Sequence, residues 1–406
     1  MSVLVRAFRR GGWCDSLDTA DLAGPGRPRL ALVPPVVADA DHRWWLGHRP
    51  TPAPAPTERR AIVLEALDLF HSGTVTVGGL GRQSAVGFRA VLWEHAGLPE
   101  ALSERWGRML QQRTQARRLA PADDALAFVA LPGSAFTCLD AVIEQAERSA
   151  AVWIRPSRRE PWSAARMVAS LLEAGWPPDR IGLYPGERGL LAALARRTDR
   201  QVVYGGQDLA GSVRDRPALT MHGAGRGCAL VPAHLPVDTA ADWLLPLIAA
   251  DAGRFCSNVR SVVCAGEVGS LADELAARLS EIRPGPGERR FPLAAFRELG
   301  EAERAVESVT ARIRPGDRTL THRPATVPAP GGGAYALPRL VLLATPGVHG
   351  RLHPLIGHEV PFPFAAVVSA TDPGITAAIT ARSLFVHRPD ATVAAPVTGL
   401  STAGER

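Results

Sequence analysis

The sequence predicts an α/β protein built from two mixed domains that follow one another along the chain. Apolar, strand-like runs alternate with helix-like stretches of about ten to fifteen residues, first from residue 126 and again from residue 228. Such alternation is typical of βαβ units and of a parallel sheet. With 406 residues, of which 46% are hydrophobic and 21% charged, the chain has the composition of a globular protein with a sizeable core.

The chain before residue 126 divides into two parts. Residues 1–60 resemble a separate N-terminal arm or preface, in which a strand-like piece at 30–37 is followed by the Pro/Ala stretch TPAPAPTERR. A stretch of this composition is extended and acts as a linker. Residues 61–120 are predicted to be mostly helical, because Arg and Glu alternate with Leu, Ala and Trp.

The first predicted sheet contains the runs ALAFVALPG, AAVWIRPS, IGLYPG and QVVYGG. Helices are predicted between these runs at 138–148 and 161–174, the second of which is ended by Gly175 and Pro177. We assign residues 61–227 to a nucleotide-binding domain, because parallel sheets bind nucleotides at the carboxyl ends of their strands.

The second predicted domain covers residues 228–370. Its strands are RSVVCAG, RLVLLATPG and FAAVVSA, and its helices are expected at 270–283 and 293–311. Residues 371–406 are predicted to return to the first domain or to form an oligomer contact.

Composition excludes several classes of function. The 46 basic residues are all arginine, so no lysine can form a Schiff base. The net charge of +6 suits an anionic partner, such as a nucleotide, coenzyme A or an acidic carrier protein. No nucleic-acid-binding motif is visible, so nucleic acid is not an expected partner.

The cysteines and the apolar segments indicate in which cellular compartment the protein is expected. Five scattered cysteines fit neither a disulfide framework nor a zinc site, so no metal is expected. The sequence shows no signal peptide and no run of about eighteen apolar residues. We therefore expect a cytoplasmic protein that does not enter a membrane.

Four segments, in order, resemble the aldehyde dehydrogenase superfamily. WIRPSRREP, followed by EAGWPPDRIGLYPG, resembles its cofactor-binding stretch, and VVYGG resembles the strand and glycine turn that follow. AGRFCSNVRSVVC resembles the Gly-Gln-x-Cys motif, and HEVPFPFAAV resembles Glu-Ile-Phe-Gly-Pro-Val-x-x-Val. The resemblance covers roughly residues 126–370 and implies a Rossmann-like cofactor domain followed by a catalytic domain.

Within that superfamily the sequence is most similar to the long-chain acyl-CoA reductases, of the type found in the fatty-acid reductase of bacterial bioluminescence. VALPGSAF resembles their Pro-Gly-Asn segment, RPSRREP their Lys-Pro-Ser-x-x-Glu-Pro, and VVYGGQD their Val-Val-Tyr-Gly-Gly-Asp. This likeness implies reduction of an acyl thioester, carried by coenzyme A or by a carrier protein, to an aldehyde.

The resemblance gives Cys256 the role of nucleophile. The residues before it, Gly253 and Arg254, fit that role, since a glycine turn lets the backbone approach an acyl group and a cation favours the thiolate. The alternative is a buried structural cysteine, which is our interpretation of the other four.

The same likeness assigns cofactor-binding residues. Arg155 occupies the position of the lysine on the adenosine ribose, followed by Ser157, and Arg158 occupies the position where NAD-using members carry a glutamate. A guanidinium attracts a 2′-phosphate, so we predict NADPH in preference to NADH. The alternative is that Arg158 belongs to a solvated face.

Three further residues complete the predicted cofactor site. Gly205 and Gly206 are expected to allow the close approach of a phosphate, and Glu359 resembles the glutamate on the nicotinamide ribose. A plain turn and an exposed glutamate are the alternatives.

Two positions depart from the family pattern. The segment MHGAGRG places His222 near the glutamate that activates water in hydrolytic members, and Ser134 replaces the asparagine of the oxyanion hole. The missing glutamate favours a thiol, not water, as the other acyl partner. His222 could still be a base, and the alternative is an ordinary loop histidine.

Three other functions stay open on this sequence. They are an acyl-phosphate reductase of the glutamyl-phosphate type, an NAD-dependent aldehyde dehydrogenase, and a non-catalytic subunit that scaffolds a multienzyme complex. A homo-oligomer is implied by the family resemblance alone.

Overall fold

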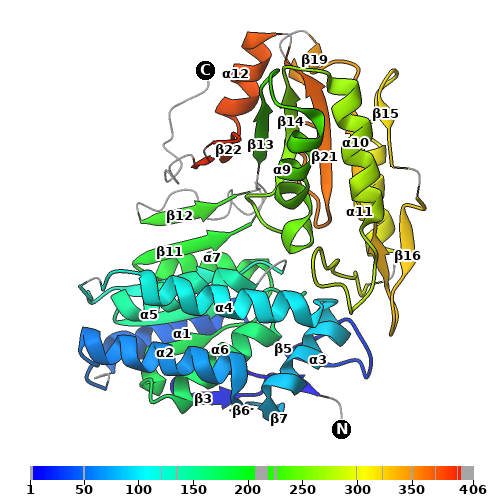
Figure 1. The fold of residues 1–406 in the computed structure, drawn as a ribbon. Helices are drawn as coiled ribbons and strands as arrows, with labels where there is room; N and C mark the ends of the chain where they lie inside the picture. Colours follow the sequence, from blue (N-terminus) through cyan, green and yellow to red (C-terminus); the bar gives the residue numbers. More distant parts are fainter. Residues whose placement is uncertain are drawn as a thin grey trace. The chain divides into compact units, whose positions relative to one another are not determined.

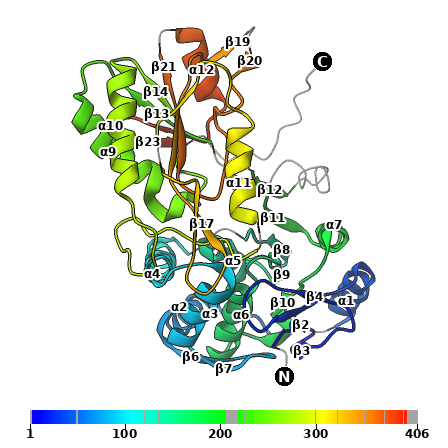
Figure 2. The ribbon, with the colours of Figure 1, turned by 90° about the vertical axis from the view of Figure 1, so that its right-hand side faces the viewer.

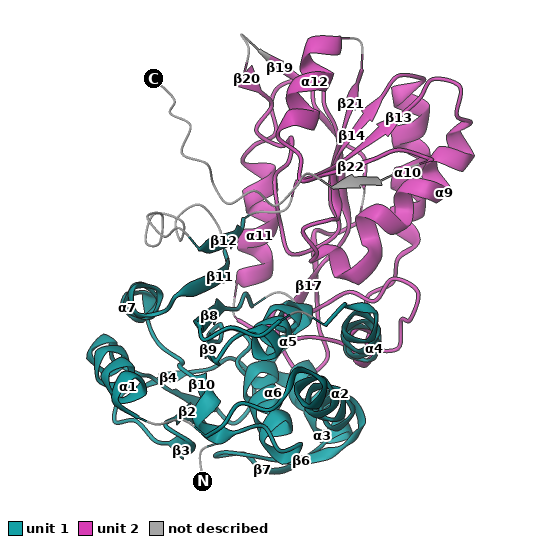
Figure 3. Cartoon of the chain, turned by 90° about the vertical axis from the view of Figure 1, so that its left-hand side faces the viewer, with its two compact units in different colours: residues 1–96, 103–223, 397–406 teal, residues 97–102, 224–396 magenta. Residues whose placement is uncertain are grey.

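The chain folds into two compact units, which are coloured separately in Figure 3. Unit 1 comprises residues 1–96, 103–223 and 397–406, and unit 2 comprises residues 97–102 and 224–396. The computed structural model describes residues 3–48, 51–119, 121–133, 136–205, 218–223, 226–298, 300–321, 323–348, 351–370, 372–390 and 392–394.

Unit 1 is built on a seven-stranded sheet with the order β12-β11-β8-β9-β10-β2-β3. Its strands are β2 (Ala7–Arg9), β3 (Gly12–Cys14), β8 (Leu126–Ala130), β9 (Ala151–Arg155), β10 (Ile181–Leu183), β11 (Arg200–Tyr204) and β12 (Leu219–His222). The five strands from β12 to β10 are parallel, and β2 and β3 extend the sheet in antiparallel fashion. All five residues of β8 are buried, which explains its unbroken apolar sequence.

The order of the parallel strands reverses between β8 and β11. The chain passes from β8 to β9 and β10 in one direction and then crosses back to β11 and β12 on the other side of β8. Right-handed crossovers therefore place α5 and α6 on one face of the sheet and α7 on the other. This is the doubly wound arrangement that the alternating sequence pattern predicted.

Helices cover both faces of this sheet. They are α1 (Pro35–Gly47), α2 (Pro56–Ser72), α3 (Ala85–Ala96), α4 (Glu100–Ala116), α5 (Leu139–Arg148), α6 (Trp162–Glu173) and α7 (Arg188–Arg197), with short 3-10 turns at Phe136–Cys138 and Pro178–Arg180. The helices α1 and α7 pack against each other, and α2 packs against α5 and α6 (Figure 1). The predictions of helices at 138–148 and 161–174 are confirmed.

The N-terminal residues, predicted as a separate arm, are part of unit 1. Strands β2 and β3 join the main sheet, while β1 (Leu4–Val5), β4 (Thr19–Asp21) and β5 (Arg29–Ala31) form a small sheet of their own. The strand expected at 30–37 is cut short, because Pro35 begins α1 at a position where proline favours a helix start.

A buried carboxylate fixes this N-terminal part to the rest of unit 1. Asp41 of α1 is fully buried and accepts hydrogen bonds from Arg9 at 2.6 and 2.9 Å, from Arg10 at 2.7 Å and from the Tyr184 hydroxyl at 3.1 Å. The hydrogen bond to Asp41 raises the pKa of Arg9. Three segments that are distant in sequence thus contact one buried carboxylate. Hydropathy patterns do not predict this contact.

The region 61–120 is helical, as predicted, except for one hairpin. Strands β6 (Thr74–Val77) and β7 (Gly81–Ser84) pair in antiparallel fashion between α2 and α3.

Unit 2 contains a second seven-stranded sheet, ordered β15-β18-β21-β14-β13-β22-β23. Its strands are β13 (Gly227–Val231), β14 (Val259–Cys264), β15 (Arg318–Thr319), β18 (Arg339–Leu342), β21 (Phe364–Ser369), β22 (Phe385–His387) and β23 (Thr392–Ala394). The five central strands are parallel, and β15 and β23 run antiparallel at the edges. Two short ribbons are formed by β16 (Thr326–Pro328) with β17 (Ala334–Ala336) and by β19 (Gly347–Val348) with β20 (Arg351–Leu352).

The helices of unit 2 also lie on both faces of its sheet. They are α9 (Val237–Ala249), α10 (Val268–Glu281), α11 (Glu301–Thr310) and α12 (Pro373–Ala381), with a 3-10 turn at Ala250–Gly253. Figure 2 shows α9 and α10 on one side of the strands and α11 and α12 on the other.

Two predictions for unit 2 need correction. The helix expected at 293–311 covers only Glu301–Thr310, because the preceding backbone pairs elsewhere: Ala295 N–H donates to the Gly97 carbonyl and Phe296 pairs with Ala334. Residues 372–394 lie in the segment expected to return to the first domain or to form an oligomer contact. They belong to unit 2, where α12 packs beside the sheet and β22 and β23 extend it. Among the described residues, no helix has the length and apolarity needed to cross a membrane.

Candidate active site

Predicted site residues of unit 1, two for the cofactor and one for catalysis, gather at one edge of its sheet. Arg155 ends β9, Gly205 follows β11 and His222 ends β12, so all three lie at the carboxyl ends of parallel strands. The strand order reverses between β8 and β11, and dinucleotides bind at such a reversal. We call this group the cofactor edge.

Arg155 is held at the cofactor edge by a backbone carbonyl. One guanidinium nitrogen donates to the Gly186 oxygen at 2.8 Å, and burial lowers the pKa of the side chain. Its Nε is buried and has no hydrogen-bond partner among the described residues. A buried donor without a partner at this position fits a ligand that accepts a hydrogen bond.

Arg158 makes a surface ion pair. A guanidinium nitrogen lies 2.7 Å from a carboxylate oxygen of Glu187, in the loop after β10, and the two side chains are 49% and 61% exposed. An exposed pair is worth little, so an incoming phosphate can compete for Arg158. Sequence analysis found Arg158 but missed the carboxylate that shares it.

Gly133, which follows β8, allows the neighbouring loop to approach. A Cβ at this position would lie 2.7 Å from the Ser157 hydroxyl and 2.7 Å from the Arg159 Cβ. The Ser157 hydroxyl accepts a hydrogen bond from the Arg159 N–H at 3.2 Å. Ser157 therefore stabilises the loop that carries Arg158.

His222 and Gly205 are joined through the last strand of the sheet. The Gly205 N–H donates to the His222 carbonyl at 3.0 Å, and the imidazole stacks on Tyr204 with ring centroids 4.4 Å apart. Burial lowers the pKa of His222, so its ring is neutral near pH 7 and able to accept a proton. Ser134 and Gly206, also predicted for the site, lie outside the described residues.

Glu160 is a buried acid beside the cofactor edge. It accepts a hydrogen bond from the Ser163 N–H at 2.8 Å in the first turn of α6, and burial raises its pKa to about 7. The sequence motif contained this glutamate, but only the structure shows its burial.

Cys256 occupies a tight turn in unit 2, immediately before β14. The Asn258 N–H donates to the Phe255 carbonyl at 3.1 Å, which closes a turn with Cys256 at its corner. The Asn258 side chain accepts from the Phe255 N–H at 2.8 Å and donates to the Leu247 and Ala250 carbonyls at 3.1 Å each. We call residues 253–258 the cysteine turn.

Exposure separates Cys256 from the other cysteines, all of which the structure describes. Cys256 is exposed, Cys228 and Cys264 are buried, and Cys14 and Cys138 are half-buried. Burial raises the pKa of the Cys228 and Cys264 thiols. Cys256 thus has the accessibility that a nucleophile requires.

A fully buried arginine fastens the cysteine turn to a second segment. The Arg260 guanidinium donates to the carbonyls of Phe362 at 3.0 Å and Val360 at 2.9 Å, and it also donates to the Gly253 carbonyl. Burial lowers the pKa of Arg260 to about 10. Arg260 therefore joins the backbone before Cys256 to the residues that follow Glu359.

The backbone before Cys256 is unusual. Asp251, Ala252 and Gly253 have φ values of 56°, 57° and 65°, in the left-handed region that non-glycine residues avoid. A Cβ on Gly253 would lie 2.6 Å from backbone atoms of Phe362 and Pro363. Glycine is therefore required where these two segments cross.

Glu359 is exposed and lies in the segment that Arg260 holds. The structure thus brings two predicted site residues, Cys256 and Glu359, onto adjoining backbone segments within unit 2. Arg155, Arg158, Gly205 and His222 share one edge of unit 1.

The comparisons with known proteins agree with this architecture. The chain superposes on an NAD-dependent aldehyde dehydrogenase from Sinorhizobium meliloti with a TM-score of 0.75 and 16% identity, over 95% of this chain and 83% of that one. It superposes on the P. syringae indole-3-acetaldehyde dehydrogenase AldA, solved with NAD+ and IAA, with a TM-score of 0.73 and 17% identity, over 96% and 85% of the two chains. The fold is that of the aldehyde dehydrogenases.

Sequence similarity is weaker. Over 177 residues the chain is 28% identical to the aldehyde-dehydrogenase-like protein y4uC of Sinorhizobium fredii, a match that covers 42% of this chain and 35% of that protein. The match thus spans about a third of that relative's length, and no family model matches the chain. The predicted fold is confirmed, whereas likeness to the acyl-CoA reductase branch stays a prediction.

Replacing Arg260 should destabilise unit 2. In Arg260→Lys, an ammonium on a flexible stem cannot reach all the carbonyls that the guanidinium satisfies, so we expect a loss of about 3 kcal/mol in unfolding free energy. Urea denaturation measures it. Arg318→Lys, at a side chain that is 60% exposed, is the matched control and should change little; equal stability of the two variants would contradict the role given to Arg260.

Glu160 should make stability depend on pH. Because its pKa is raised in the folded protein, from 4.5 to about 7, its favourable contribution is complete below pH 4.5 and is lost as the pH rises through 7. Relative to Glu160→Gln, the wild type should therefore lose on the order of 2–3 kcal/mol between pH 4 and pH 8. Thermal unfolding at several pH values tests this, with Glu173→Gln, at an exposed residue ending the same helix, as control. Parallel pH curves for wild type and Glu160→Gln would contradict it.

Proposed function

We propose that this protein is a nicotinamide-dependent oxidoreductase that acts on aldehydes through a covalent bond to Cys256. The observation that carries the proposal is the cysteine turn: Cys256 is exposed at the corner of a turn fixed by the buried side chains of Asn258 and Arg260. It stands on a fold whose solved relatives are named as aldehyde dehydrogenases.

The chemistry begins at the sulfur. The Cys256 thiolate attacks the aldehyde carbonyl carbon, forming a C–S bond and placing negative charge on the carbonyl oxygen. The Cys256 backbone N–H is a donor for that oxygen. A bound nicotinamide dinucleotide would take up the hydride that leaves this carbon, and an acyl group then remains on the sulfur as a thioester.

The residues of the cofactor edge fit such a dinucleotide. The strand order reverses between β8 and β11, and the unpartnered Nε of Arg155 is a donor at that reversal. Arg158 would bind the adenosine ribose or its 2′-phosphate. The family resemblance alone gives Glu359 the nicotinamide ribose.

His222 is the candidate base for the second half of the reaction. Its neutral imidazole can accept a proton, since burial holds its pKa below the usual range. The family resemblance alone gives this position the activation of the water or thiol that attacks the thioester. The C–S bond breaks as the new bond to the acyl carbon forms, and the thiolate of Cys256 is regenerated.

One observation favours a second candidate function, in which the reaction runs in reverse and an activated acid is reduced to an aldehyde. A histidine stands where the family resemblance places the water-activating glutamate, so a thiol is a more natural acyl partner than water. The substrate would then be an acyl thioester of coenzyme A or a carrier protein, reduced to the aldehyde by NADPH.

Intact-protein mass spectrometry tests the nucleophile and the direction together. We expect wild-type protein to gain an acyl group when it is incubated with octanoyl-CoA alone, or with octanal plus NAD+ or NADP+, and Cys256→Ala to gain none. Cys14→Ala is the control, because that cysteine is half-buried. If octanal with NAD+ or NADP+ forms the adduct and octanoyl-CoA does not, the result supports oxidation. If octanoyl-CoA forms an adduct that NADPH then removes, the result supports reduction. Equal labelling of wild type and Cys256→Ala would overturn the proposal.

The Arg158–Glu187 pair should set the choice of cofactor. In Glu187→Gln the guanidinium is released from its carboxylate, so we expect NADPH to bind several-fold more tightly and NADH to be little changed. In Arg158→Gln the preference for NADPH should be lost. Titration of protein fluorescence measures both dissociation constants, with Glu173→Gln as the control of equal charge change. Unchanged NADPH binding in both Arg158→Gln and Glu187→Gln would contradict this role.

A further inference from the structure

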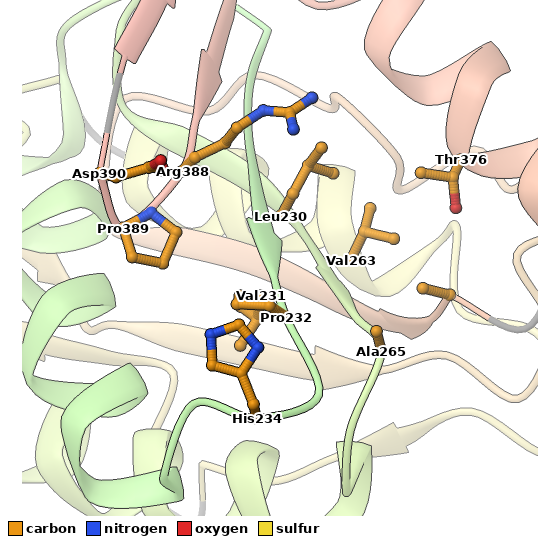
Figure 4. Close-up of a pocket in the computed structure, with 11 residues that line it drawn as sticks. Leu230, Val231, Pro232, His234, Val263, Ala265, Thr376, Arg388, Pro389 and Asp390 are labelled. Atoms are coloured by element: carbon orange, nitrogen blue, oxygen red, sulfur yellow. The ribbon is translucent and has the colours of Figure 1, made fainter.

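Unit 2 has a cavity of about 500 Å³ that the proposed chemistry does not use (Figure 4). We call it the carboxyl-edge pocket, because it is lined by the ends of the central strands and the residues that follow them. Its lining residues are Leu230, Val231, Pro232, His234, Val263, Ala265, Ala370, Thr376, Arg388, Pro389 and Asp390.

The pocket and Cys256 lie at opposite edges of the same sheet. Cys256 precedes β14, which begins at Val259, whereas the pocket takes Val263 near the end of that strand and Ala265 beyond it. Six residues of extended strand span about 20 Å. The pocket is therefore too far along the strand to hold an aldehyde at the sulfur.

The topology of the sheet reverses at this pocket. The chain passes from β13 to β14 through α9, and it later passes from β21 through α12 to β22, which lies on the other side of β13. Helices α9 and α12 lie on opposite faces, as Figure 2 shows. Loops that diverge in this way leave a crevice at the carboxyl ends of the strands, which is where ligands bind in parallel α/β sheets.

The lining combines an apolar floor with one cation. Leu230, Val263, Ala265 and Ala370 are the floor, and in Figure 4 the side chain of Arg388 extends above Leu230. Arg388 is exposed, and it has no hydrogen bond or ion pair to another described residue. A volume of 500 Å³ lies within the range of pockets that bind small molecules.

We propose that the carboxyl-edge pocket binds a small monocarboxylate with an apolar chain. The carboxylate pairs with Arg388, and the chain covers Leu230 and Val263. Helices α9 and α10 both begin at this edge, so their positive ends also favour an anion. Asp390, two residues after Arg388, disfavours a second negative charge and so selects against dicarboxylates and phosphates.

Calorimetric titration with octanoate tests the site directly. We expect octanoate to bind, and octylammonium and octanedioate to bind at least about tenfold more weakly because of their charge. Arg388→Gln should weaken octanoate binding by about tenfold or more, and Ala265→Trp, which fills the floor, should abolish it. Arg382→Gln is the matched control, since that exposed arginine ends α12 without lining the pocket, and it should bind as wild type does.

Cys256→Ala separates this site from the reactive one and should bind octanoate unchanged. The proposal is overturned if octanoate does not bind, if Arg388→Gln and Ala265→Trp both bind it as well as wild type does, or if binding is lost in Cys256→Ala but kept in Arg388→Gln. None of these results depends on catalytic activity, so failure of this proposal can be distinguished from failure of the proposed function.

Discussion

The geometry of the candidate nucleophile depends on one buried guanidinium. Arg260 is 1% exposed and donates to backbone carbonyls of two crossing segments, while the negative charge of Glu359 partly offsets the lowering of its pKa by burial. A buried charge is tolerated only when its donors are satisfied, so the carbonyls must stay in place. The same bonds hold Gly253 against Phe362 and keep three residues in the left-handed region before Cys256. A single strand residue thus fixes the path of the turn that exposes the thiol.

Unit 1 uses a comparable device for a different purpose. The buried Asp41 carboxylate accepts hydrogen bonds from Arg9, Arg10 and Tyr184. These bonds fix the N-terminal strands to the doubly wound sheet. At the cofactor edge the opposite condition holds, because Arg155 keeps a buried Nε without a partner in the described residues. Arg155 is one of several buried polar groups without a partner among the described residues, and it is the one at the strand-order reversal where the topology predicts a ligand.

Much of the fold could be predicted from the sequence, because its strands and helices are amphipathic or fully buried. The run ALAFVA predicted β8, and apolar periodicity predicted the helices at 138–148 and 161–174. The helix expected at 293–311 failed where tertiary pairing of Ala295 and Phe296 outweighed helix propensity. Cys256 could be found from its motif and glycine turn. Arg260 and Asn258 could not, although a charged residue inside the buried run VRSVVC is a usable signal.

The two edges of the second sheet have different physical character, and this difference suits the two roles that we propose for them. At the amino ends of the strands, the cysteine turn is closed by bonds from Asn258 and Arg260, so its geometry is fixed before any substrate arrives. At the carboxyl ends, the loops diverge because successive crossovers lie on opposite faces, and they leave apolar side chains beside Arg388. A fixed turn suits covalent chemistry, whereas a crevice formed by diverging loops suits reversible binding. Strand β14 runs from one edge to the other, so it carries both Arg260, which supports the cysteine turn, and Val263 of the pocket.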